Sequence, residues 1–148
     1  MLGLLIIAHA PLASSLRAVA LHAFPDCARE LQALDVWPNM ESAEIEAQAR
    51  ALLKQLSSRQ VLVFTDVFGA TPCNVAQRLA DGHDVKVIAG VNVPMLWRSL
   101  CYGNEPLEAV AARAIAGATQ GVMQVAATRP QNQAQKRGDD QAHDHHQQ

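Results

Sequence analysis

Apolar runs alternate along the first 126 residues with segments whose apolar positions recur at helical spacing. Continuous apolar runs are typical of strands buried in a parallel sheet, whose two faces are both covered by helices. The pattern predicts strands at 2–8, 31–36, 61–65 and 85–89, and helices at 12–23, 42–56, 72–79, from about 94 onward, and at 106–118. A short apolar piece at 121–126 predicts a last strand.

This alternation predicts the α/β class, with a doubly wound, mostly parallel open sheet. We assign the sheet the order 2-1-3-4, which is one of the common doubly wound arrangements. In that order the first and third strands are neighbours. Their carboxyl ends flank the point where the winding reverses, which is where open α/β sheets bind ligands. The residues that follow the first and third strands are therefore the first candidates for chemistry.

The composition changes sharply near the carboxyl end. Residues 129–148 are almost entirely polar, and apart from Pro130 they contain no apolar side chain larger than that of alanine. Such a segment cannot bury enough surface to offset its ordering entropy, so we expect one domain over 1–128 and a disordered polar tail over 129–148. The tail histidines suggest at most weak metal binding, and no metal site is expected.

Composition also limits the classes of function. The formal net charge is −2 and aromatic residues make up 4% of the chain, which argues against a nucleic-acid-binding surface. The three cysteines form neither a CxxC pair nor a disulfide framework, which favours the cytoplasm. The amino-terminal apolar run lacks a basic leader and is too short to span a bilayer, so no membrane insertion is expected.

Two residues with catalytic potential follow neighbouring strands. His9 follows the first strand and Asp66 follows the third. A carboxylate that accepts a proton from Nδ1 of a histidine leaves Nε2 unprotonated, as a nucleophile requires. The bland alternatives are a hydrogen-bonded histidine at a strand end and a turn aspartate.

The segment after Asp66 predicts an anion site. Gly69 permits close backbone approach, Thr71 is a natural N-cap, and Pro72 fits the first helical position. The free N–H groups and dipole of a helix amino terminus favour a phosphate. A nucleophilic histidine beside such a site favours phosphoryl transfer over acyl transfer.

Three segments resemble the enzyme IIA domain of the mannose-type phosphotransferase system. They are Ile-Ala-His at 7–9, Asp-Val-Phe-Gly-Ala-Thr-Pro-Cys-Asn at 66–74 and Ala-Gly-Val-Asn-Val-Pro-Met-Leu at 89–96. The resemblance covers about residues 1–126, with the blocks in the family's order and at its intervals.

The resemblance implies a phosphohistidine carrier, that is, a phosphotransferase component. His9 would accept a phosphoryl group on Nε2 from the phosphocarrier protein HPr, and Asp66 would orient its ring. The group would pass to a IIB protein, or the chain would serve as a regulatory switch, since no IIB domain follows. The residues expected around the phosphate are Gly69, Thr71 (where the family usually has serine), Cys73 and Asn74.

The resemblance also implies a homodimer in which a carboxyl-terminal antiparallel strand is exchanged, and 121–126 is placed for that role. Transfer between two histidines depends on positioning and charge stabilisation, so no cofactor is expected.

Other functions remain open. The same histidine could serve a phosphoryl relay to a dihydroxyacetone kinase, or the crevice could bind a small ligand in a flavodoxin-like module. A phosphoaspartate receiver lacks the acidic pair after the first strand that Mg²⁺ would need. The GxxxxGK[ST] loop of a P-loop NTPase and the GxSxG turn of an α/β hydrolase are both absent from the sequence. We expect His22 and His83 to be surface or packing residues, and Trp97 to belong to the core or to a protein-docking surface.

Overall fold

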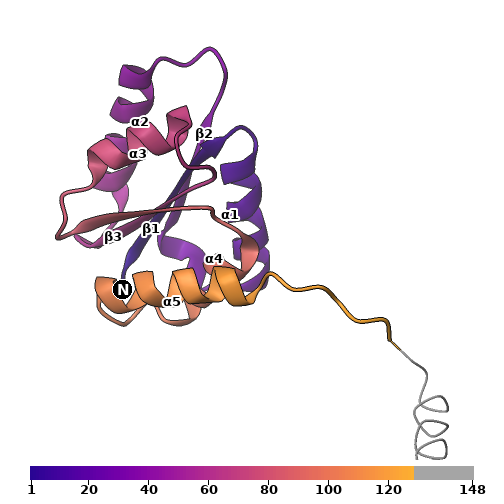
Figure 1. The fold of residues 1–148 in the computed structure, drawn as a ribbon. Coiled ribbons are helices and arrows are strands. Elements are labelled where there is room, and N and C mark those ends of the chain that lie inside the picture. Colours follow the sequence, from indigo (N-terminus) through magenta and orange to yellow (C-terminus); the bar gives the residue numbers. More distant parts are fainter. Residues whose placement is uncertain (129–148) are drawn as a thin grey trace, which may run out of the picture.

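The computed structural model describes residues 1–128 and contains one four-stranded parallel sheet (Figure 1). Its strands are β1 (Gly3–His9), β2 (Leu31–Val36), β3 (Val61–Thr65) and β4 (Val85–Ala89), in the order β2-β1-β3-β4. All three pairings are parallel, so the carboxyl ends of the strands lie along one edge. The predicted α/β class and the predicted strand order are confirmed.

Helices cover both faces of the sheet and begin and end within one or two residues of their predicted positions. They are α1 (Leu12–Ala23), α2 (Ser42–Gln55), α3 (Thr71–Leu79), α4 (Val93–Cys101) and α5 (Leu107–Gln120). A short 3₁₀ helix, η1 (Cys27–Glu30), was not predicted. The core residues divide into one layer under α2 and α3 and another under α1, α4 and α5.

The two layers explain why the first strand is apolar throughout. Along β1, Leu4 and Ile6 pack into the layer of α1, α4 and α5, while Leu5 and Ile7 pack into the layer of α2 and α3. Successive side chains of a strand point to opposite faces, so a central strand covered on both sides must be apolar at every position. Because every earlier side chain of β1 is buried, the first polar side chain can reach solvent only at the carboxyl end of the strand.

Helices α4 and α5 pack closely because small and capping residues lie between them. The Asn92 side chain accepts a hydrogen bond from the Met95 N–H (2.9 Å) and donates one to the Ala118 carbonyl (3.3 Å). A Cβ atom on Gly117 would lie 2.8 Å from Cβ of Arg98, and one on Gly121 would lie 2.5 Å from Cβ of Pro94. Both glycines are therefore required for this approach, and the end of α5 is held against the start of α4.

The predicted last strand does not form within the single chain. Residues 121–126 contain no strand and leave the domain after α5, as the orange segment of Figure 1 shows. Val122, Met123 and Val125 are 70–82% exposed. Within residues 1–128, β4 pairs only with β3, which leaves its other edge open. In an exchanged dimer, this apolar segment of one copy would pair with the open edge of β4 in the other copy. The exchange stays a prediction.

The expected disordered tail, 129–148, lies outside the described residues. Among the helices of residues 1–128, none is long and apolar enough to cross a membrane.

We expect the intact chain to sediment as a dimer and a chain ending at residue 120 to sediment as a monomer. The truncation removes the apolar segment that would pair with the β4 edge of a second copy. Analytical ultracentrifugation provides the measurement, and a chain ending at residue 128 is the control that should remain dimeric. A dimer that persists without residues 121–148 would contradict the exchange.

Candidate active site

His9 is the last residue of β1 and the first side chain of that strand to reach the surface. Ile7 and Ala8 are fully buried, whereas the His9 side chain is 54% exposed. It lies at the carboxyl edge of the central pair β1 and β3, where the winding of the sheet reverses. The strand thus delivers a polar ring to solvent on a rigid backbone.

The structure brings His9 and Asp66 together, as the sequence predicts. Parallel pairing of Ile7 with Thr65 places Asp66 beside the end of β1. The His9 ring nitrogen Nδ1 lies 2.7 Å from Asp66 Oδ2, and the His9 backbone N–H donates to the same oxygen at 3.0 Å. The other oxygen, Oδ1, accepts from the Val67 N–H at 2.9 Å. The carboxylate therefore holds both the ring and the backbone of His9.

These contacts assign the proton on the His9 ring. An ionised carboxylate only accepts hydrogen bonds, so Nδ1 must carry the proton in the pair with Asp66. In the neutral ring Nε2 then has a free electron pair. The pair fixes the tautomer and orientation that a histidine nucleophile requires.

Asp66 remains ionised because its hydrogen bonds outweigh its burial. Burial raises the pKa of the Asp66 carboxyl. The hydrogen bonds from the backbone N–H and ring of His9 and from the Val67 N–H, together with the charge of His9, lower the pKa by more than burial raises it. The net result is a pKa below the usual value for aspartate. Asp66 can then offset positive charge that develops on the His9 ring.

The connection between β4 and α4 holds the backbone of Thr65 and Asp66 by hydrogen bonds. The Gly90 N–H lies 2.9 Å from the Thr65 carbonyl and 3.1 Å from the Asp66 carbonyl, and the Val91 N–H donates to the Thr65 carbonyl at 3.1 Å. Gly90 has φ +91°, a conformation that favours glycine. The third sequence block, 89–96, thus supports the aspartate without contributing a side chain to it.

Helix α3 begins beside this pair, one residue earlier than predicted. Ala70 is its N-cap and Thr71 its first residue, so the Thr71 hydroxyl does not cap the helix, and this expectation is wrong. Gly69 precedes the cap with φ +88°, which lets the loop turn into the helix. The first turn of α3 holds Pro72 and no acidic residue. Its dipole is therefore free to attract an anion.

The four predicted phosphate-contacting residues are placed differently from one another. Thr71 is exposed and lines the same pocket as His9. Gly69 can offer only its backbone. Cys73 is 2% exposed, so its thiol lies in the interior and only its N–H, in the first turn, is suited to an anion. The Asn74 N–H already donates to the Ala70 carbonyl at 3.0 Å, which leaves its exposed side chain. Thr71 is the best-placed of the four.

A second carboxylate, Asp35 on β2, escaped the sequence argument. Its Oδ1 accepts a hydrogen bond from the Ser14 N–H at 3.0 Å, in the first turn of α1. The amino terminus of α1 is therefore already matched with a negative charge, unlike that of α3. The signal in the sequence was a charged residue near the end of an otherwise apolar strand.

A pocket of about 250 Å³ adjoins the His9 ring. It is lined by His9, Thr71 and Val36, the last residue of β2, and by Trp37, Pro38 and Met40 of the connection from β2 to α2. Sequence reasoning passed over this connection because it carries no titratable motif. Bulky apolar residues directly after a strand end were the available signal.

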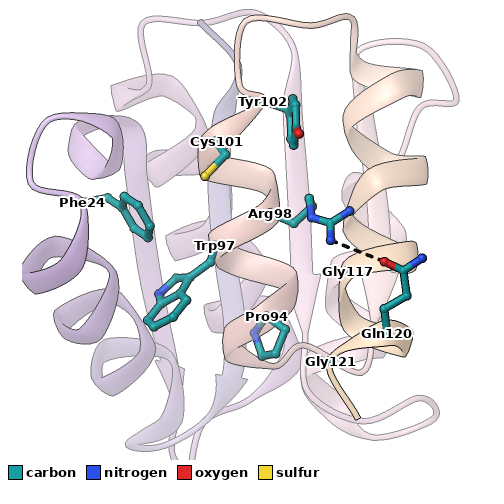
Figure 2. A pocket seen from close by; sticks show the side chains of 9 residues that line it. All are labelled: Phe24, Pro94, Trp97, Arg98, Cys101, Tyr102, Gly117, Gln120 and Gly121. Atoms are coloured by element: carbon teal, nitrogen blue, oxygen red, sulfur yellow. Dashed lines mark hydrogen bonds between the residues drawn. The ribbon is translucent and has the colours of Figure 1, made fainter. Parts of the chain in front are cut away.

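A larger hollow, about 420 Å³, lies among α1, α4 and α5 and shares no lining residue with the pocket at His9 (Figure 2). Trp97 is 42% exposed there and packs edge-to-face against Phe24, with ring centroids 5.8 Å apart. Trp97 is thus a surface residue and not a core residue. His22 and His83 are exposed, as expected.

The fold and site define a class of α/β protein with a histidine, oriented by a carboxylate, at the switch point of its sheet. The family model for the PTS system fructose IIA component (EIIA-man) matches residues 3–115, and the chain belongs to this family. The family is that of a phosphotransferase-system component, which assigns the chain a role in phosphotransfer. No curated protein sequence matches at a significant level.

Solved structures share the fold. The mannose/sorbose-specific IIA subunit from Enterococcus faecalis superposes with a TM-score of 0.77 at 21% identity, over 87% of this chain and 98% of that one. EIIA from Streptococcus agalactiae gives 0.74 at 20% identity, over 84% and 97%. A PTS IIA protein associated with the fucose utilization operon of Streptococcus pneumoniae gives 0.70 at 22%, over 82% and 91%.

We expect Asp66→Asn to lower the free energy of unfolding by about 1–2 kcal/mol at neutral pH, because a charge-assisted acceptor is lost. A carboxyl whose pKa falls on folding stabilises the protein above its unfolded pKa, about 4, and this contribution disappears as the pH falls through the folded pKa. The difference from wild type should therefore shrink toward zero in acid. Urea denaturation at several pH values measures it.

Asp26→Asn is the control, because the Asp26 side chain is 93% exposed and precedes η1 and the amino end of β2, whereas Asp66 follows the carboxyl end of β3. It should change stability little at any pH. A deficit of Asp66→Asn that stays constant from neutral pH into acid would contradict the ionised pair.

Proposed function

We propose that the chain is a cytoplasmic phosphocarrier of the phosphoenolpyruvate-dependent phosphotransferase system. His9 accepts a phosphoryl group on Nε2 from HPr and either passes it to a IIB protein or acts as a regulatory switch. The observation that carries this proposal is the 2.7 Å contact between His9 Nδ1 and Asp66 Oδ2, in a ring that is still more than half exposed. Membership of the IIA family supports it.

The transfer is a displacement at phosphorus between two imidazoles. The electron pair of His9 Nε2 attacks the phosphorus of the donor's phosphohistidine, an N–P bond forms, and the donor's N–P bond breaks. The donor ring keeps the electron pair of the broken bond. Positive charge then develops on the His9 ring, and Asp66, ionised and bonded to Nδ1, offsets that charge.

The amino terminus of α3 supports the negative end of the same reaction. Phosphoryl transfer spreads charge over three oxygens, so fixed donors nearby stabilise it without rearranging. The first-turn N–H groups of α3 and the Thr71 hydroxyl are the candidates on this chain. The α1 terminus is already matched to Asp35, whereas the α3 terminus holds no acidic residue and begins at Thr71, which lines the pocket with His9.

We expect the chain to take up label from phosphoenolpyruvate in the presence of enzyme I and HPr, and His9→Ala to abolish that uptake. The label should be lost in acid and retained in alkali, as for phosphohistidine. His22→Ala and His83→Ala are matched controls, because both side chains are exposed and neither follows a strand end: His22 is in the last turn of α1, and His83 precedes the amino end of β4. Wild-type protein that takes up no label from active donors, or label that survives in His9→Ala, would refute the proposal.

We expect Thr71→Val to slow uptake by about tenfold and Thr71→Ser to leave it nearly unchanged. A hydrogen bond to a charged group contributes about 1.5–3 kcal/mol, and about 1.4 kcal/mol corresponds to a tenfold change in rate. Valine retains the shape of threonine without the hydroxyl. Initial rates at fixed HPr make the comparison, and equal rates for the two variants would remove the hydroxyl from the mechanism.

A further inference from the structure

Two polar side chains within residues 1–128 are fully buried, and they differ in their hydrogen bonding. Ser99 on α4 donates through Oγ to the Met95 carbonyl at 2.8 Å. Thr65 is also 0% exposed, but its Oγ1 has no hydrogen-bond partner among residues 1–128. A buried hydroxyl without a partner destabilises a folded protein. Packing alone would therefore favour valine over threonine at position 65.

Thr65 lies on the same face of the sheet as His9. It is the last residue of β3 and pairs with Ile7 of β1. Side chains of a strand alternate between the two faces, and Val63 packs into the layer of α2 and α3, so the Thr65 side chain faces that layer too. Ile7 packs into the same layer, and His9, two residues further along β1, shares a pocket with the first residue of α3.

The backbone of Thr65 is held in place, whereas its hydroxyl is not. The Thr65 carbonyl accepts hydrogen bonds from the N–H groups of Gly90 (2.9 Å) and Val91 (3.1 Å). Helix α3 packs against β1 and β3, and Pro72 and Cys73 in its first turn are buried. The unpaired hydroxyl thus lies in the layer under α3, the helix whose first turn faces the pocket at His9.

We propose that Thr65 is a phosphoryl-binding residue that makes its contact only after His9 has been phosphorylated. The phosphoryl group adds acceptor oxygens to this face of the sheet, and the Thr65 hydroxyl is a donor that lacks an acceptor. A rotation about χ1 of Thr65 and a small shift of the first turn of α3 bring the two groups into hydrogen-bond contact. The inference rests on the phosphorylation of His9 proposed above, and it explains why the apolar run of β3 ends in threonine.

The first measurement is the equilibrium constant for phosphoryl transfer from HPr to the chain. Thr65→Val keeps the shape of threonine without the hydroxyl, and we expect it to lower this constant by about tenfold, since only the phosphorylated state loses a hydrogen bond. Thr65→Ser retains a hydroxyl and should restore most of the loss. Ser99→Ala removes the buried hydroxyl that already has a partner and should match wild type. A wild-type constant for Thr65→Val would overturn the proposal.

Unfolding of the unphosphorylated protein separates this role from a structural one. Thr65→Val removes an unpaired buried hydroxyl and should raise the urea midpoint, whereas Ser99→Ala removes a hydrogen bond and should lower it. A structural role alone would move the midpoint and leave the equilibrium constant of transfer unchanged. A lower midpoint for Thr65→Val would show that the hydroxyl is already paired before phosphorylation, and the proposal would be wrong.

Phosphoramidate, a small phosphoryl donor, makes the comparison independent of HPr. Phosphorylation by phosphoramidate should raise the urea midpoint of wild type by more than that of Thr65→Val, because only wild type gains the hydrogen bond. Phosphate on other exposed histidines contributes equally to the two proteins. Equal rises would overturn the role of Thr65. Wild type that accepts phosphate at His9 from phosphoramidate but not from active HPr would instead refute the proposed function, and this comparison would still decide the role of Thr65.

Discussion

The carboxylate of Asp66 is the constraint on which the rest of the site depends. It accepts three hydrogen bonds, two from His9 and one from Val67, and so fixes the ring, the end of β1 and the start of the following loop together. This arrangement requires β1 and β3 to be parallel neighbours, because only then do their carboxyl ends meet. The sheet order is therefore part of the chemistry.

The amino termini of α1 and α3 differ in whether a carboxylate already lies beside them. Both α1 and α3 begin at the carboxyl edge, and either terminus would attract an anion. Asp35 neutralises the first, and the first turn of α3 holds no acidic residue. Of these two termini, α3 is the one left open to an anion, and its first residue, Thr71, lines the same pocket as His9.

The apolar runs predicted the strands, because burial on both faces leaves little ambiguity in a central strand. The strand order was predicted from a common doubly wound arrangement and not from the runs themselves. His9 and Asp66 followed from their positions at the ends of two such runs. The sequence pattern indicated Thr71 as the N-cap of α3, but the cap is Ala70, one residue earlier. The exact start of a helix depends on the preceding turn, here at Gly69, whose conformation the sequence pattern does not show. Asp35 was missed because its hydrogen bond to Ser14 joins β2 to α1, and no local spacing encodes such a contact. Trp37 was missed because the connection that carries it has no titratable motif. The segment 121–126 has the composition of a strand, yet a strand also needs a neighbour, and one chain does not provide it.

Gly121 links the packing of α4 and α5 to the direction in which the following residues leave the domain. The lack of a side chain there lets α5 end against Pro94, which sets the direction in which the following residues leave the domain. Extended residues advance about 3.3 Å each, so a small rotation at this point is amplified along residues 122–128. A single methyl group at Gly121 would thus redirect residues 122–128 and change which surface they can contact, while leaving the arrangement of His9 and Asp66 in place.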